Sequence, residues 1–496
     1  MTADSSKSSR ARRFIGHASI YAIGNIVRHI ASFLMLPIYT RCLSPADYGV
    51  VGLMTFSISL IELVFGARLG LAIPKYYFNT QDDHIRNAVI STALIITGTF
   101  SSVTVLVLIL FRIPASQGIF GTPVYANIFA LFATQLLSQA LESYGLLFVR
   151  LQQRPWLFIS LSLSKLVLQL TFNIWLIVIK GLGVMGIAIS GMVSSFLFAI
   201  ILMIYTLRHV GVRFELGMAQ KMIRFCWPLW LAGFAGLYIG SGNRYYLRIF
   251  SSLNDVGLYE LASKFSNVIT MLIWEPFSQY WQVERFRYYQ QDNAQYIFQQ
   301  VFLGISTLLV LAALGISIFA GPVIRIMADS AFYHAADSVP FLMFGVVFSS
   351  LVYFSNFSFL INEETSWLTR SNYITAALVT ILYLVLVPLA GHVGAALSLM
   401  LAQGFQFILV HRVSRRYYDM GISLIPLAKI VIISAITCLL ANGLLTGNNF
   451  YENLAIKSVA YAFAALFILR PVWKKPEARR LFKDIISPLY CFAKNR

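Results

Sequence analysis

Ionisable side chains interrupt the long apolar stretches of this 496-residue sequence, and their types indicate the chemistry they could perform. Guanidinium and ammonium groups bind phosphate oxygens, which favours an anionic substrate. A buried carboxylate offers a site for a proton or Na⁺, whose binding can be linked to neighbouring cations. The substrate-binding candidates are Arg28, Arg68, Lys165, Arg244 and Lys264. The ion-coupling candidates are Glu62, Glu260 and Glu275, with Glu142 as a further deep acid.

The sequence lacks the patterns that would indicate a catalytic, metal or nucleotide site. Four scattered cysteines form no CxxC pair and have no histidine at ligand spacing, so we expect neither a metal nor a disulfide framework. The stretch GLGVMGIAIS at 181–190 contains G-x-G-x-x-G, but no strand precedes it and the next acid is Glu215. A dinucleotide-binding turn needs that strand, and an acid about 20 positions further on. We therefore predict no catalytic residues and no cofactor.

Two predicted helices carry their polar residues on one face. At about 100° per residue, the first helix places Arg28 near mid-span, on a face shared with four polar neighbours. The eighth helix has a stripe about 80° wide, in which Glu260 and Lys264 stand at i,i+4 and can pair. The members of that stripe are Glu260, Lys264, Asn267, Met271, Glu275, Ser278 and Gln282.

Each of these charges also has a plainer interpretation. A polar stripe can tie helices together instead of lining a cavity, and Arg68 and Arg244 lie near span ends, from which they can reach the headgroups. Arg28 is too deep for that. Because ionisable groups at membrane depth usually face water, we favour a cavity-facing role for Arg28 and for the stripe on the eighth helix.

The elements that must hold these residues are membrane-spanning helices. Hydrophobic residues make up 58% of the chain and charged residues 12%, about half of the charged share in soluble proteins. Apolar runs of 18 or more residues recur, and each is long enough to cross a bilayer. The fold class is therefore an all-α membrane protein. The fourteen predicted spans are 14–38, 48–72, 87–111, 124–149, 156–179, 182–206, 222–245, 256–282, 297–321, 338–361, 368–388, 391–411, 424–446 and 453–471.

The basic residues predict the orientation of these spans. With a cytoplasmic N-terminus, 27 of the 38 Lys and Arg residues fall at inner segments and span ends, and 6 in outer connections. This bias follows the positive-inside rule and predicts that the basic segments 1–13 and 472–496 are both cytoplasmic. Anionic lipids on the inner leaflet suffice as partners for the net charge of +18, so we expect no nucleic acid.

Two motifs recur at one spacing and indicate a duplication. The pattern S-x-x-D-x-G at 44–49 returns at 252–257, and G-x-x-G-x-A-x-S at 183–190 returns at 391–398, both at an offset of 208 residues. We therefore predict two pseudo-symmetric six-helix bundles at 14–215 and 216–412, followed by two additional helices within 413–471. Parallel repeats of this kind enclose the substrate path of a transporter between them.

The stretch Tyr39-Thr40-Arg41-Cys42-Leu43-Ser44-Pro45-Ala46-Asp47-Tyr48-Gly49 resembles a signature of the polysaccharide transporter family, the Wzx-type oligosaccharide flippases of the MOP exporter superfamily. The duplication and the charge pattern are similar too, and the resemblance covers about 14–412. It implies a MATE-like fold and a bacterial inner-membrane flippase. Arg28 matches that family's cationic first helix. The two extra helices are also found in relatives such as lipid II flippases.

The resemblance further implies the cargo. It would be a polyprenyl-pyrophosphate-linked oligosaccharide, such as an O-antigen, capsule or exopolysaccharide repeat unit, moved from the cytoplasmic to the periplasmic leaflet by alternating access. Partners would be H⁺ or Na⁺ and other polysaccharide assembly proteins. One alternative is a MATE-like drug/cation antiporter, which should favour acids over bases in its cavity. The other is a membrane polysaccharide polymerase, which usually needs a sizeable extramembrane loop or an Asp-x-Asp site that this sequence lacks.

Overall fold

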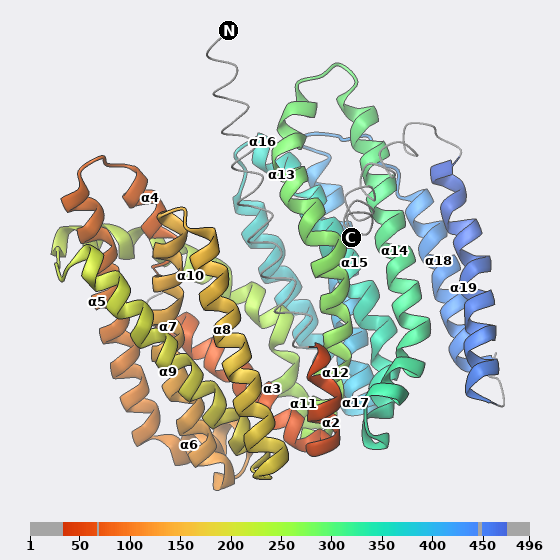
Figure 1. The fold of residues 1–496 in the computed structure, drawn as a ribbon. Coiled ribbons are helices and arrows are strands. Elements are labelled where there is room, and N and C mark those ends of the chain that lie inside the picture. The colour runs from red at the N-terminus through yellow and green to blue at the C-terminus, as the bar shows by residue number, and fades with distance from the viewer. Residues whose placement is uncertain (1–32, 67–68, 445–448, 474–496) are drawn as a thin grey trace. The chain divides into compact units, whose positions relative to one another are not determined.

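The computed structural model describes residues 33–66, 69–444 and 449–473, and this part of the chain contains helices and turns but no strand. The contacts between helices divide the chain into two compact units, Met1–Arg248 and Ile249–Arg496. Unit 1 contains α2 Leu36–Cys42, α3 Pro45–Phe65, α4 Ala72–Phe78, α5 Asp83–Leu110, α6 Arg112–Phe120, α7 Ala126–Leu151, α8 Pro155–Ile174, α9 Gly183–Val210, α10 Leu216–Ser241 and most of α11 Asn243–Phe250 (Figure 1).

Unit 2 contains the remaining helices. They are α12 Leu253–Ile269, α13 Glu275–Tyr289, α14 Ala294–Met327, α15 Val339–Ser355, α16 Phe357–Ile361, α17 Ser366–Ser414, α18 Ile425–Leu439 and α19 Phe450–Trp473. A 3-10 segment, η4 Ser330–Ser338, joins α14 to α15, and three π turns adjoin α8, α12 and α18: η2 Trp175–Ile179, η3 Thr270–Trp274 and η5 Leu440–Leu444.

Eleven helices of the described residues are long and apolar enough to cross a membrane, so the chain is a multi-pass membrane protein. The count of fourteen spans stays a prediction, and three features account for the difference. Most of the span at 14–38 lies outside the described residues. Two predicted spans run together in α17, which has non-helical backbone angles at Ala390 and Gly391. The predicted span 256–282 is helical, but it is not among the eleven apolar helices.

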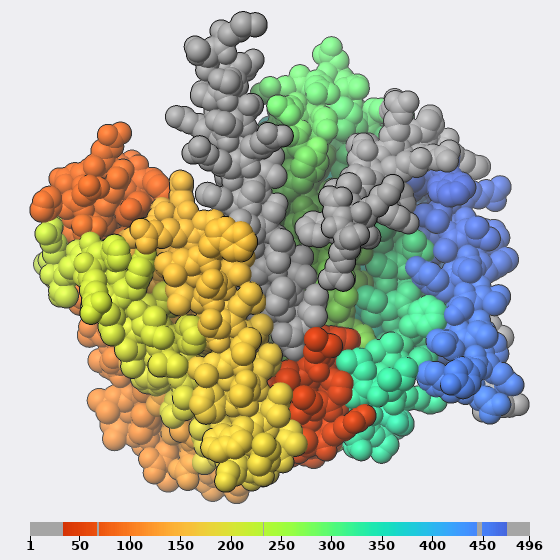
Figure 2. Space-filling view, viewed as in Figure 1, coloured from red at the N-terminus to blue at the C-terminus, as the bar shows by residue number. Residues whose placement is uncertain are grey.

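Each unit has its own core. In unit 1, α7 packs against α5 and α9, and a cluster of buried side chains includes Val89, Leu94, Phe148 and Met222. In unit 2, α15 packs against α12, α14 and α17, while α18 and α19 pack on α14. Figure 2 shows the surface of α18 and α19 in blue along one edge of that unit.

The repeated S-x-x-D-x-G motif is a helix N-cap in both units. The Ser44 hydroxyl accepts from the Asp47 amide at 3.1 Å, and the Asp47 carboxylate accepts from the Ser44 amide at 3.1 Å, which makes a capping box at the start of α3. Ser252 caps α12 with the first of these two bonds, because its hydroxyl accepts from the Asp255 amide at 3.1 Å. The motif recurs because each helix needs partners for its first free amides.

Replacing Ser44 with alanine is expected to destabilise the protein by about 1 kcal/mol, since the first amides of α3 lose their cap. Unfolding in mixed detergent micelles measures this change. Thr55→Ala is the matched control, because it removes an exposed hydroxyl from the same helix that bonds only to the Val51 carbonyl. Equal stability of the Ser44 and Thr55 variants would contradict the capping role.

The repeated glycine motif also has one conformation in both units. Gly183 has φ +52° at the start of α9, and Gly391 has φ +51° at the kink of α17. This left-handed region is costly for other residues. A Cβ on Gly186 would lie 3.2 Å from the Leu176 Cβ, and one on Gly394 would lie 2.0 Å from the Leu386 carbonyl oxygen. The second glycine of each copy therefore permits a close approach.

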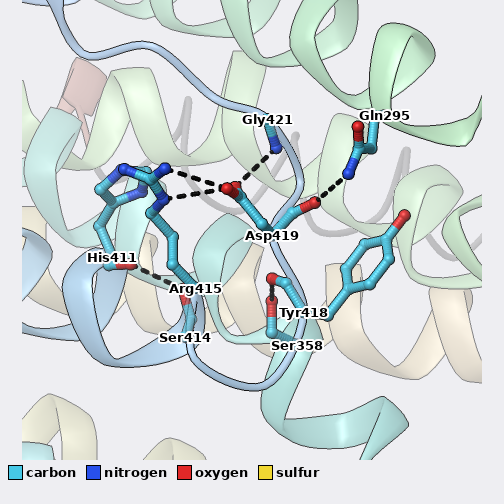
Figure 3. A network of polar contacts seen from close by, with 8 residues as sticks. All are labelled: Gln295, Ser358, His411, Ser414, Arg415, Tyr418, Asp419 and Gly421. Atoms are coloured by element: carbon cyan, nitrogen blue, oxygen red, sulfur yellow. Dashed lines mark hydrogen bonds and ion pairs between the residues drawn. The ribbon is translucent and has the colours of Figure 1, made fainter.

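The loop after α17 is fastened by the polar network in Figure 3. The Asp419 carboxylate accepts from the Arg415 guanidinium at 3.0 and 3.2 Å and from the Gly421 amide at 2.9 Å. Gln295 of α14 donates to the Asp419 carbonyl at 2.9 Å, and Ser358 of α16 donates to the Tyr418 carbonyl at 3.0 Å. The network thus ties the end of α17 to α14 and α16.

The ionised form of Asp419 holds this loop. Partial burial would raise its pKa, but the hydrogen bonds from Arg415 and Gly421 outweigh burial and hold the pKa below the ordinary aspartate value. A depressed pKa gives stability that is present above about pH 4 and is lost as the pH falls through the lower folded value. Asp419→Asn should therefore reduce protection of the Gly421 amide at pH 7 in hydrogen exchange. The exposed control Asp292→Asn should leave that protection unchanged, and equal protection in all three proteins would contradict the role of Asp419.

Candidate functional site

Two of the predicted site residues, Arg28 and Arg68, lie outside the described residues. The basic segment 1–13 and most of the basic segment 472–496 also lie outside them. The structure places the remaining candidates on six helices. In unit 1, Glu62 is on α3, Glu142 on α7, Lys165 on α8 and Arg244 on α11. In unit 2, Glu260 and Lys264 are on α12, and Glu275 begins α13.

The helix that carries Lys264 has a π turn in its middle. α12, η3 and α13 follow one another without a break from Leu253 to Tyr289. Before the turn, buried positions follow helical spacing at Leu258, Ala262, Phe265 and Ile269. After it they continue at Trp274, Phe277, Trp281 and Arg285. From Ile269 to Trp274 the spacing is five residues, one more than the usual four, because a π turn adds one residue to the helix. The turn lies next to Pro276, which has no N–H to donate to the preceding turn.

This turn corrects the predicted polar stripe. An inserted residue rotates everything after it by about 100° relative to the residues before it. Glu275, Ser278 and Gln282 therefore do not share one narrow face with Glu260 and Lys264, as an ideal helix would require. Glu275 is exposed, whereas Glu260 is only 8% exposed. The seven-residue stripe was wrong beyond Met271, because sequence spacing does not reveal a π turn.

Lys264 has a half-buried side chain on the polar side of α12. It makes no ion pair or hydrogen bond in the part of the chain that is described, and the predicted pair with Glu260 is not formed. Glu260 is buried and has polar interactions of its own. The predicted span 256–282 places Lys264 at membrane depth, where a half-buried ammonium without a counter-ion is costly. Such groups usually serve a ligand or line a water-filled cavity.

In unit 1, two of the charged candidates pair with each other, and Arg244 and Glu62 lie elsewhere. The Lys165 ammonium lies 2.5 Å from the Glu142 carboxylate, and the side chains are 19% and 12% exposed. This pair joins α8 to α7 and leaves no net charge at that place. Arg244 is half-buried and donates to the Ser241 carbonyl and the Asn243 amide oxygen, both at 3.3 Å. Glu62 is half-buried near the end of α3.

Sequence reasoning missed two buried cations because it assigned them to connections. Arg285 is 9% exposed, and its guanidinium lies 5.1 Å from the Phe357 ring centre and 5.5 Å from that of Phe286. Lys457 is 5% exposed within α19. Its burial could have been predicted, because Lys457 lies four residues after the start of the predicted span 453–471. Arg285 left no such signal, since its helix continues beyond the predicted end at 282.

Comparison with known proteins agrees with the predicted family. Residues 16–281, more than half of the chain, match the model of a family described as polysaccharide biosynthesis protein. No match was found among curated proteins. A solved structure of the lipid II flippase MurJ, in an inward closed conformation, is similar with a TM-score of 0.72 and 13% identity, covering 92% of this chain and 99% of that chain.

Two further solved structures share the fold. An inward-facing MATE family multidrug resistance transporter of the MOP superfamily has a TM-score of 0.63 and 14% identity, covering 81% of this chain and 99% of its own. A MOP superfamily transporter from Pyrococcus furiosus has a TM-score of 0.53 and 14% identity, and the match covers 83% of this chain and 96% of that chain. The MATE-like all-helical fold is thereby confirmed. This chain therefore shares its fold with a lipid II flippase and with MATE family transporters.

Proposed function

We propose a function from one premise: this chain belongs to the polysaccharide biosynthesis protein family. The protein moves a polyprenyl-pyrophosphate-linked oligosaccharide, the repeat unit of an O-antigen, capsule or exopolysaccharide, from the cytoplasmic to the periplasmic leaflet. Transport proceeds by alternating access and is coupled to H⁺ or Na⁺. The similarity to a lipid II flippase supports this choice of a lipid-linked cargo over a soluble drug or cation.

The observation that carries the proposal is the uncompensated charge of Lys264. A membrane helix that retains a half-buried cation without a described counter-ion has a site for an anion. The pyrophosphate of the cargo is such an anion, and ammonium and guanidinium groups bind its oxygens. A cation antiporter would instead need an excess of acids at this depth.

The remaining roles follow from position and charge. Arg28, Arg244 and Lys264 contact the pyrophosphate, and Arg68 completes the basic set. Lys165 ranks below them, because Glu142 already neutralises it. Glu62, Glu260 and Glu275 are the groups to which the coupling ion binds. Of these, Glu260 is best placed, since it is buried one helical turn from Lys264.

The protein lies in the bacterial inner membrane with both termini in the cytoplasm, as the distribution of Lys and Arg favours. Segments 14–215 and 216–412 form the two transporting bundles, with α10 of the second bundle packed on α3 and α5 of the first. The helices within 413–471 are an addition to them. Anionic lipids bind the basic segments 1–13 and 472–496, and other polysaccharide assembly proteins supply and receive the cargo.

Deleting the gene tests the proposal. We expect the deletion strain to lose surface glycan and to accumulate the lipid-linked repeat unit on the cytoplasmic leaflet, and expect the wild-type gene to restore both. If surface glycan persists while sensitivity to cationic drugs rises, the protein is an antiporter. Accumulation of single repeat units in the periplasmic leaflet would instead identify a polymerase.

A further inference from the structure

A cavity of about 640 Å³ lies within unit 2, away from Lys264 in the sequence and on different helices. The end of α14, η4, the start of α15, the end of α18 and the start of α19 supply its walls. The lining combines apolar side chains such as Phe341 and Phe344 with two cations, Arg325 and Lys457. Cavities of about 300–1,000 Å³ hold molecules of drug size, so the space suits more than an inorganic ion.

The deepest cation in this cavity is Lys457. Its ammonium donates to the Ile318 carbonyl at 3.1 Å and to the Asn442 amide oxygen at 2.6 Å. The Ile318 carbonyl is available because Pro322, four residues later in α14, has no N–H to donate. Lys457 thus replaces a missing helix hydrogen bond. A neutral amide could do the same, so the hydrogen bonds alone give no reason for a charge.

The charge of Lys457 has no carboxylate partner in the described chain. Asp337 supplies the one carboxylate among the described lining residues, and it pairs with His334 at 3.2 Å. Arg325 is exposed and lies over the Tyr333 ring at 5.8 Å. A lysine near a span end usually extends to the headgroups, but Lys457 is 5% exposed and stays inside. The cavity therefore holds excess positive charge.

We propose that this cavity binds the phosphate group of an anionic membrane lipid, with Lys457 and Arg325 as its cationic ligands. An ammonium has three donors, and Lys457 uses two of them on the protein, which leaves one for a phosphate oxygen. Arg325 presents its guanidinium at the exposed part of the lining, where the rest of the headgroup lies. The apolar lining residues cover the glycerol and the first acyl carbons.

This site also accounts for an exception in the charge distribution. Arg325 and Lys457 are two of the six basic residues that the sequence count assigns to the outer side, and the structure places Lys457 near the start of α19. Basic residues are sparse on that side of a membrane protein, and here two of them share one cavity. The ligand is therefore expected in the outer leaflet. The inference does not depend on the transported cargo, because its residues are separate from those proposed to bind pyrophosphate.

Lipid binding to the purified full-length protein tests the proposal, with phosphatidylglycerol and diacylglycerol as probes in native mass spectrometry. We expect tighter binding of phosphatidylglycerol, and expect Lys457→Gln to weaken it by roughly tenfold or more through loss of a charge-assisted hydrogen bond. Lys457→Arg should retain most of the affinity. The control Lys429→Gln removes an exposed charge from α18 outside this cavity and should leave the affinity unchanged.

Two further measurements complete the test: lipid binding by an Arg325 variant, and competition with inorganic phosphate. Arg325→Gln changes an exposed residue of the same cavity, so it reports on binding even if the Lys457 variant fails to fold. Wild-type affinity in every variant of Lys457 and Arg325 that folds would overturn the proposal. Millimolar inorganic phosphate should not displace the lipid. If it does, the cavity takes a free phosphate anion and the assignment to a lipid is wrong.

Discussion

Lys264→Ala should reduce surface glycan production by at least about tenfold in a deletion strain, because the cargo loses a charge-assisted contact of about 1.5–3 kcal/mol. Lys264→Arg should retain a large part of the activity, since it keeps the charge. The initial rate of glycan appearance, normalised to the amount of protein in the membrane, measures the effect.

The control for this prediction is Lys180→Ala, which removes an exposed lysine beyond the end of α8. It should transport at the wild-type rate. A Lys264→Ala protein that is present at normal abundance and produces normal surface glycan would remove the main support for an anion site on α12.

The ion pair between Glu142 and Lys165 is expected to contribute strongly to stability. Its side chains are 12% and 19% exposed, so either single neutralisation leaves an uncompensated charge among membrane helices. Glu142→Gln or Lys165→Gln alone should cost about 3 kcal/mol or more. The double variant should unfold within about 1 kcal/mol of the wild type, because a neutral amide pair needs no counter-ion.

A double-mutant cycle measured by unfolding in mixed micelles gives the coupling between the two residues. A coupling near zero, with both single variants as stable as the wild type, would show that the pair is as weak as one on the surface. Lys165 would then be available to bind the cargo directly, which would contradict the proposal that Glu142 neutralises it.

Much of the fold could be predicted because its signals are local and repeated. Apolar runs indicate membrane helices wherever the run is long enough. The repeat of S-x-x-D-x-G indicated a duplication, and the structure shows that the motif is a cap whose hydrogen bonds reach only three residues along the chain. Gly183 and Gly391 share a positive φ because one backbone turn occurs in both copies. Such features depend on neighbouring residues, so sequence spacing describes them well.

The candidate site was harder to predict, because its geometry depends on helix register and on contacts between distant segments. The π turn at Thr270–Trp274 shifts Glu275 away from the face of Lys264, and no residue pattern revealed it. Glu142 and Lys165 are 23 residues apart and meet only because α7 and α8 pack side by side. Lys457 was assigned to a connection, although it reaches a carbonyl of α14 that Pro322 leaves free.

Reconstituted liposomes test the central claim most directly. Purified protein would be inserted with a fluorescent polyprenyl-pyrophosphate-linked sugar in both leaflets, and a membrane-impermeant quencher would report how much cargo stays protected inside. The flippase account predicts that the protected fraction disappears with wild-type protein, and disappears at least about tenfold more slowly with Lys264→Ala. Persistence of that fraction with folded wild-type protein, under both proton and sodium gradients, would contradict the account.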